Sequence, residues 1–95
     1  MNQPNQIQVK ASDEILRGHY ANALQISHTK DEVIFDFLSL VPPQGQLVSR
    51  VITSPSHAKQ ILVALTSNIK LYETQYGALT ASPVQAKEFG FSNPA

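Results

Sequence analysis

The sequence predicts an α+β domain, with an antiparallel β-meander of three to four strands followed by one long C-terminal helix packed on one face of the sheet. Three observations predict this class. Residues 33–41 are almost wholly apolar and rich in β-branched and aromatic types, as in a central strand. Residues 47–53 are typical of the next strand. A helical pattern follows at once, opened by Ser54 and Pro55 and closed by Gly77.

The segments before the central strand are shorter. Residues 1–11 form a polar arm in which residues 7–11 alternate, which predicts a short strand. Ser12 is a suitable cap for a single helical turn that Gly18 ends. Residues 20–28 alternate weakly and are the predicted first strand of the sheet, and residues 29–32 form a polar turn. We therefore expect one domain over residues 12–77.

Two segments of the chain lack a strand or helix pattern. Pro42 and Pro43 place residues 42–46 in a loop, because proline removes a donor that a paired strand needs. Residues 78–95 contain two prolines, small side chains and no periodicity. We expect them to form a loosely ordered tail.

The turn at residues 29–32 decides which strand residues share a face. If His28 pairs with Val33, Ile26 lies opposite Phe35 and Leu24 opposite Phe37. Pairing Val41 with Leu47 completes one apolar face, which we predict to be the core and to carry the helix: Leu24, Ile26, Val33, Phe35, Phe37, Val41, Leu47 and Val51. The other face contains Ala21, Ala23, Ile34, Asp36, Leu38, Leu40, Val48, Arg50 and Ile52. A slip of one residue would exchange the two sets.

The long helix carries an apolar stripe within about 100° of arc, formed by Ala58, Ile61, Leu62, Leu65, Ile69, Tyr72 and Tyr76. The helix is about 33 Å long, and three short strands cannot cover a helix of that length. Only 15% of the residues are charged, which is below the usual quarter, so charge protects less of the surface from association than in an average protein. We therefore expect a homodimer or a dimer of dimers. The interface candidates are Leu38, Leu40, Val48 and Ile52 on the sheet, with Val63 and Leu71 on the far side of the helix.

Composition narrows the class of function. Seven basic and seven acidic residues give a formal net charge of zero, which argues against nucleic-acid binding. The absence of cysteine excludes disulfides and thiolate chemistry. No apolar run approaches the roughly 20 residues of a membrane span, and the polar start lacks a signal core. We expect a cytoplasmic protein without membrane attachment.

Two clusters are candidate sites. Asp36 and Arg50 fall on one face of neighbouring strands, close to opposite each other. They predict an ion pair that sets strand register or an interface, or else a buried pair at a binding cleft. Ser54, Ser56, His57 and Lys59 surround a helix start, where free N–H groups can hold a phosphate or carboxylate. Simple capping by Ser54 is the alternative.

Metal binding and catalysis have little support. His19, His28 and His57 share no ligand spacing, and no carboxylate cluster joins them, so we expect no metal and no cofactor. No nucleophile, base and oxyanion donor can be assembled, and no phosphate-binding glycine loop is present. We expect a protein that is not an enzyme.

Residues 18–77 contain a recognisable set of motifs, of which Ser-Pro-x-His-Ala-Lys at the helix start is the most specific. The residues in these motifs are Tyr20, Ala21, Asn22, Asp36, Phe37, Ser49, Arg50, Ser54, Pro55, His57, Ala58, Lys59, Tyr72, Glu73 and Gly77. In these motifs the chain resembles a small family of bacterial and archaeal proteins, catalogued as domain of unknown function 3467. The resemblance implies a single natural domain and carries no activity, substrate or cofactor to transfer.

The leading functional hypothesis is a non-enzymatic, homo-oligomeric adaptor that binds another protein. A second is a client-binding chaperone, since strands followed by a long helix resemble in outline the SecB-type secretion chaperones. A third is a nucleic-acid-binding or anion-sensing regulator that uses Arg50 and the helix start.

Overall fold

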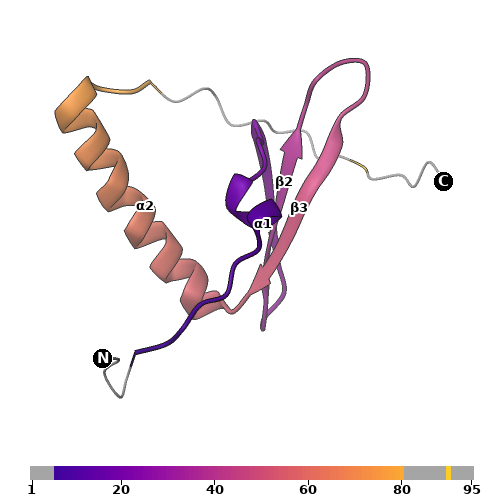
Figure 1. Ribbon diagram of the computed structural model, residues 1–95, viewed down its shortest axis with the longest axis horizontal. Helices are drawn as coiled ribbons and strands as arrows, with labels where there is room; N and C mark the ends of the chain where they lie inside the picture. Colours follow the sequence, from indigo (N-terminus) through magenta and orange to yellow (C-terminus); the bar gives the residue numbers. More distant parts are fainter. Residues whose placement is uncertain (1–5, 81–89, 91–95) are drawn as a thin grey trace.

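A computed structural model describes residues 6–80 and residue 90 of the chain. Its three strands form one antiparallel sheet in the order β1-β2-β3, and a long helix follows (Figure 1). The elements are α1 (Asp13–Arg17), β1 (Ala23–His28), β2 (Val33–Ser39), β3 (Gln46–Thr53) and α2 (Pro55–Tyr76). The predicted α+β meander with a following helix is thus confirmed, with three strands.

The N-terminal arm differs from its prediction. Residues 7–11 form no strand, so the expected short strand is wrong. Ile7 and Val9 are 84% and 85% exposed, and the sheet consists of β1, β2 and β3 without this segment. The predicted loose tail lies outside the described residues, except for residues 78–80 and 90, which belong to no helix or strand.

The β1–β2 register follows the prediction. His28 pairs with Val33, Ile26 with Phe35 and Leu24 with Phe37. Thr29 organises the turn, since its Oγ1 accepts hydrogen bonds from the backbone N–H of Asp31 at 3.3 Å and of Glu32 at 3.2 Å. A side chain that satisfies turn donors holds the two strand ends in one register.

The β2–β3 pairing contains an irregularity. Phe37 pairs with Ser49 and Leu38 with Leu47, so Val48 is an extra residue in β3. The predicted pairing of Val41 with Leu47 is wrong, because β2 ends at Ser39 and this bulge moves Leu47 to the face that carries Leu38.

The register defines two sheet faces. We call one the Phe35 face, formed by Leu24, Ile26, Val33, Phe35, Phe37 and Val51. We call the other the Asp36 face, formed by Ala23, Ile34, Asp36, Leu38, Leu47, Arg50 and Ile52.

The two faces differ in burial within the central strand. Asp36 is 2% and Leu38 is 4% exposed, whereas Phe35 and Phe37 on the other face are half-buried. On the outer strands both faces are open, with exposures of 56% for Ile26 and 54% for Ile52. The most buried residues lie on the Asp36 face, so the prediction that the Phe35 face forms the core is wrong for the single chain.

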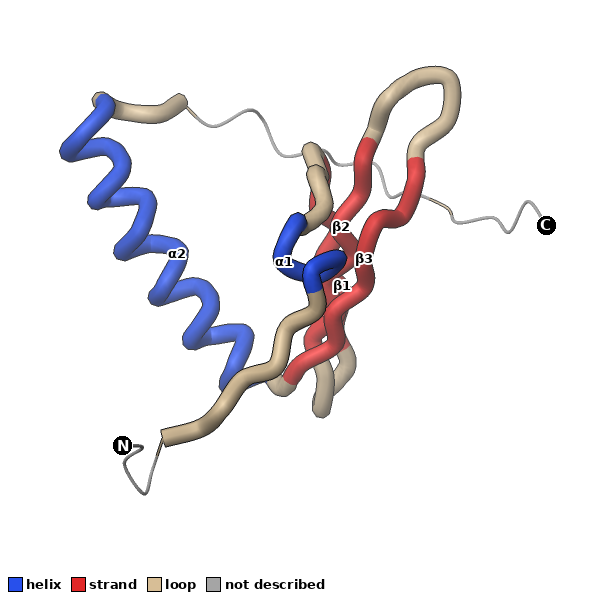
Figure 2. The backbone as a smooth tube through the Cα atoms, in the orientation of Figure 1, coloured by secondary structure: helices blue, strands red, loops and turns tan. Residues whose placement is uncertain are grey.

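Helix α2 begins and ends at the predicted residues. Ser54 is its N-cap, Pro55 its first residue and Gly77 its C-cap, with a φ of +103° that suits glycine. The helix and the sheet diverge like the two arms of a V from the end of β3 (Figures 1 and 2). No residue of α2 is buried, so the predicted packing of the helix on its own sheet is wrong.

The short connection between β3 and α2 gives the physical reason. Only Ser54 separates the two elements, and its φ of −77° and ψ of 155° are extended. Its side-chain oxygen accepts the His57 N–H, and its carbonyl accepts the Ala58 N–H at 3.0 Å. Both acceptors of the connecting residue are thus used by the helix, which sets the direction in which α2 leaves the sheet.

Asn22 directly precedes β1 and extends the pairing of the sheet by one residue before Ala23. Its Oδ1 accepts the Leu40 N–H at 2.7 Å, and its Nδ2 donates to the Leu40 carbonyl at 3.3 Å. The Asn22 backbone N–H donates to the Leu38 carbonyl at 2.9 Å. The side-chain amide therefore takes the place of a strand peptide group opposite Leu40.

Replacing Asn22 tests this pairing. We expect Asn22→Ala to lower the free energy of unfolding by about 1 kcal/mol, because two hydrogen bonds to Leu40 are lost. Asn22→Asp keeps an acceptor for the Leu40 N–H but sets its second oxygen against the Leu40 carbonyl, so it should also destabilise the chain. Denaturant unfolding of the full chain measures both, and an Asn22→Ala midpoint equal to that of the wild type would contradict the assignment.

Candidate functional site

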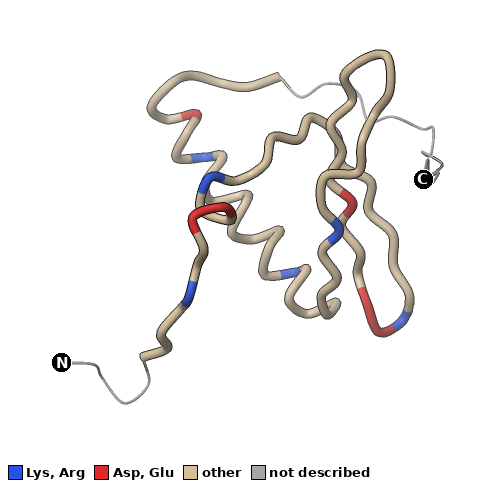
Figure 3. Tube along the Cα trace, turned by 45° about the vertical axis from the view of Figure 1, so that its right-hand side comes forward, with Lys and Arg blue, Asp and Glu red and all other residues tan. Residues whose placement is uncertain are grey.

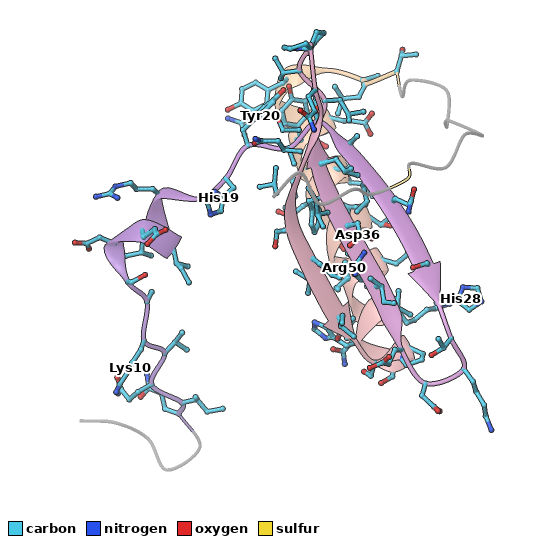
Figure 4. All side chains as sticks on the ribbon, turned by 90° about the vertical axis from the view of Figure 1, so that its right-hand side faces the viewer. Lys10, His19, Tyr20, His28, Asp36 and Arg50 are labelled. Carbon is cyan, nitrogen blue, oxygen red and sulfur yellow. The ribbon has the colours of Figure 1, made fainter. Side chains whose placement is uncertain are left out.

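The structure brings Asp36 of β2 and Arg50 of β3 together, directly opposite each other in the register (Figure 4). Arg50 Nε donates to Asp36 Oδ1 at 2.6 Å, and Arg50 Nη2 donates to Oδ2 at 3.1 Å. Both carboxylate oxygens thus accept from one guanidinium, which is the strong two-point geometry of an arginine–carboxylate pair.

The two partners are buried very differently. The side chain of Asp36 is 3% exposed, whereas that of Arg50 is 48% exposed. The hydrogen bond from Arg50 to Asp36, and then the negative charge of Asp36, raise the pKa of the Arg50 guanidinium above its ordinary value. Arg50 is consequently charged at any ordinary pH and neutralises the buried carboxylate.

Figure 3 shows how the charged residues are distributed along the chain. In the register of the sheet, Asp36 is paired with Arg50. No buried side-chain nitrogen or oxygen in the described part of the chain lacks a hydrogen-bond partner. Both oxygens of the Asp36 carboxylate accept from Arg50, which favours the structural interpretation of the pair over a catalytic one.

At the start of α2, three of the four predicted residues lie close together. Ser54 Oγ accepts the His57 N–H at 3.1 Å and lies 3.3 Å from Ser56 Oγ. His57 Nδ1 lies 3.0 Å from Gln60 Oε1, so the ring donates if the amide presents its oxygen. These contacts are those of a capped helix terminus.

Lys59 is exposed in the first turns of α2. The helix start therefore combines a capping serine with an exposed lysine and a histidine that contacts its own helix. Anion binding by Ser54, Ser56, His57 and Lys59 stays a prediction, while the capping role of Ser54 is observed.

The predicted interface residues fall into three groups by burial. Leu38 is 4% exposed and belongs to the small core of the single chain. Leu40 and Val48 are half-buried. The remaining three offer open apolar surface, with exposures of 54% for Ile52, 58% for Val63 and 68% for Leu71.

Other candidate sites are sparse in the part of the chain that the structure describes. Within it, no three His, Cys, Asp or Glu side chains are close enough together to hold a metal ion. Among the described helices, none has the length and apolar character needed to cross a bilayer.

Sequence reasoning missed two features of the structure, one at the start of β1 and one along α2. One is the pairing of the Asn22 side chain with the Leu40 backbone, for which an asparagine just before a strand was the available signal. The other is the exposure of the α2 stripe, for which the single residue between Thr53 and Pro55 was the available signal.

The unequal burial of Asp36 and Arg50 yields a prediction. A buried carboxylate that loses its partner costs roughly 3–5 kcal/mol. We expect Arg50→Met to lower the melting temperature by more than about 10 °C at neutral pH. Asp36→Asn should cost less, because the half-exposed Arg50 that it leaves behind can reach water.

A double variant checks this explanation. D36L/R50L removes both charges, so no uncompensated carboxylate is buried, and it should be more stable than Arg50→Met. Equal losses of melting temperature for Arg50→Met and Asp36→Asn would contradict the explanation.

The helix cap gives a second prediction. We expect Ser54→Ala to destabilise the chain by about 1 kcal/mol, because the His57 N–H loses its acceptor. Ser56→Ala is the matched control, since Ser56 accepts no backbone bond in this turn, and it should change stability by a few tenths of a kcal/mol at most. A thermal or denaturant melt that ranks the two in the opposite order would refute the cap.

The comparison with known proteins gives one match. No curated protein and no solved structure matches the chain significantly. The profile of the family described as "Protein of unknown function (DUF3467)" matches residues 1–81, which confirms the resemblance drawn from the motifs of residues 18–77. With most of its length matched, the chain belongs to this family of unknown function.

Proposed function

We propose that the chain is a non-enzymatic, homo-oligomeric protein-interaction module, an adaptor whose fold is completed by self-association. The observation that carries the proposal is the amount of patterned apolar surface that the single chain leaves open. The α2 stripe remains accessible along most of the helix, with exposures of 56% for Leu62, 57% for Leu65, 38% for Ile69, 45% for Tyr72 and 68% for Tyr76.

The sheet adds a second open surface. On the Phe35 face, Leu24 is 46%, Ile26 is 56% and Val51 is 45% exposed. Phe35 and Phe37 stack on this face with ring centroids 6.5 Å apart and are only half-buried. Apolar surface of this extent and order is typical of an interface.

Energetics support association. Ordering the backbone costs about 1–2 kcal/mol per residue, and burial of apolar side chains is the main term that offsets it. Among the described residues, Leu38 is the one buried hydrophobic side chain. A 95-residue chain with so small a core needs a partner surface to reach ordinary stability.

The chemistry of the surface favours protein over nucleic acid. The chain has no net formal charge, and the α2 stripe and the Phe35 face consist of uncharged, mostly apolar side chains. Nucleic-acid binding depends largely on neutralising phosphates, which these surfaces cannot do.

The adaptor role needs apolar surface that self-association leaves free. Val63 and Leu71 lie on the side of α2 away from the stripe and are 58% and 68% exposed. Ile52, on the Asp36 face, is 54% exposed. These residues are the proposed docking surface for a second protein.

Light scattering after size exclusion tests self-association. We expect a dimer or larger species, and we expect Leu65→Glu to weaken it at least tenfold, since a charge replaces an apolar side chain in the stripe. Val63→Glu is the matched control, because Val63 is equally exposed on the opposite side of α2. A wild-type chain that is monomeric at tens of micromolar would overturn the proposal.

The adaptor role has its own test. A partner captured by the wild type should be lost with Leu71→Glu, a variant that should keep the wild-type mass in solution. Ser67→Glu, on the same side of α2 but without loss of an apolar side chain, should retain it. Equal capture of the partner by the wild type, Leu71→Glu and Ser67→Glu would show that Leu71 is not part of the docking surface.

A further inference from the structure

We infer that two copies of the chain exchange helices, so that α2 of each copy lies on the Phe35 face of the other copy's sheet. This inference rests on the self-association proposed above and names the surfaces that meet. The residues brought together are the α2 stripe and the six members of the Phe35 face.

The connection at Ser54 argues against closure within one chain. A single residue joins Thr53, the last residue of β3, to Pro55, the first of α2. Ser54 is held by the His57 N–H at 3.1 Å and the Ala58 N–H at 3.0 Å, and Pro55 restricts its own φ. A short, fixed connection that points an element away from its own domain favours exchange with a second copy.

The exposed fractions of the stripe residues differ between the start of α2 and its later turns. Ala58 and Ile61, the stripe residues nearest the sheet, are half-buried. Leu65 and Tyr76, further along the same stripe, are 57% and 68% exposed. The backbone of α2 is closest to the sheet at the start of the helix and diverges from it toward Tyr76 (Figure 2).

The two surfaces match in chemistry. Each presents an aromatic pair among aliphatic side chains, with Tyr72 and Tyr76 5.0 Å apart on the helix and Phe35 and Phe37 6.5 Å apart on the sheet. Lys59 and Lys70 lie on the same side of α2 as Val63, so the stripe itself carries no lysine. The Asp36 face suits the helix less well, because covering it would remove the half-exposed Arg50 from water.

A second copy is the occupant that fits best. A chain with one buried hydrophobic side chain among its described residues needs its partner in order to fold, and another copy is present whenever the chain is made. Each copy offers one helix and one face, so a two-fold axis satisfies both pairs and closes the assembly. The zero formal charge of each chain brings no net repulsion between copies.

The lengths are also compatible. Helix α2 has 22 residues and is about 33 Å long, whereas β2 with its seven residues spans about 23 Å. The helix of one copy can therefore cross the whole Phe35 face of the other.

Cysteine cross-linking tests the exchange, since the chain has no cysteine of its own. The double variant I26C/L65C carries one thiol on the Phe35 face and one on the stripe. With a short bismaleimide, we expect covalent dimers from this variant and from neither single variant. The control I26C/V63C, with a thiol of matched exposure on the far side of α2, should cross-link far less.

The other outcomes overturn the exchange in distinct ways. Covalent dimers from Leu65→Cys alone would mean that two α2 helices pair, and dimers from Ile26→Cys alone would mean that two sheets pair. Cross-linked monomers from the double variant would mean that α2 folds back on its own sheet. A dimeric mass with no cross-link in I26C/L65C or in a second pair, L24C/I69C, would also refute it, while a monomeric mass would refute self-association itself.

Discussion

The arrangement of this chain depends on the one-residue connection between the sheet and the long helix. Ser54 leaves β3 in an extended conformation and gives both of its acceptor oxygens to the first turn of α2. The direction of the helix is thereby set by local hydrogen bonds rather than by packing. Because α2 leaves at this angle, the apolar stripe and the Phe35 face stay apart, and the open V of the single chain follows (Figure 1).

The sheet has a constraint of its own in the Asp36–Arg50 pair. A carboxylate that is almost fully buried is stable only opposite its guanidinium, so a slip of β3 against β2 would leave it unpaired. The regular register continues through one more pair, Phe37 with Ser49, before the Val48 bulge changes it. The Asn22 amide supports the other edge of β2 by bonding the Leu40 backbone. These polar contacts thus help to specify the register of the sheet.

Much of the local structure followed from the sequence. The bounds of α2 were correct because Ser54, Pro55 and Gly77 act through backbone chemistry that needs no tertiary partner. The β1–β2 register was correct because Thr29 and its neighbours form a tight turn. The strand expected at residues 7–11 was wrong because alternation makes a strand only where a neighbouring strand offers hydrogen bonds. The Val48 bulge was missed because one inserted residue leaves no mark on an apolar pattern.

The sequence by itself determined the element types, the helix caps, the two-sided character of the sheet and the opposition of Asp36 and Arg50, since all of these arise from short-range periodicity and turn geometry. Only the tertiary structure decided that Asp36 and Leu38 are the buried pair and that the Phe35 face and the α2 stripe stay open. Burial depends on where whole elements lie relative to one another. Here that placement is governed by the angle at Ser54, which an apolar pattern does not encode.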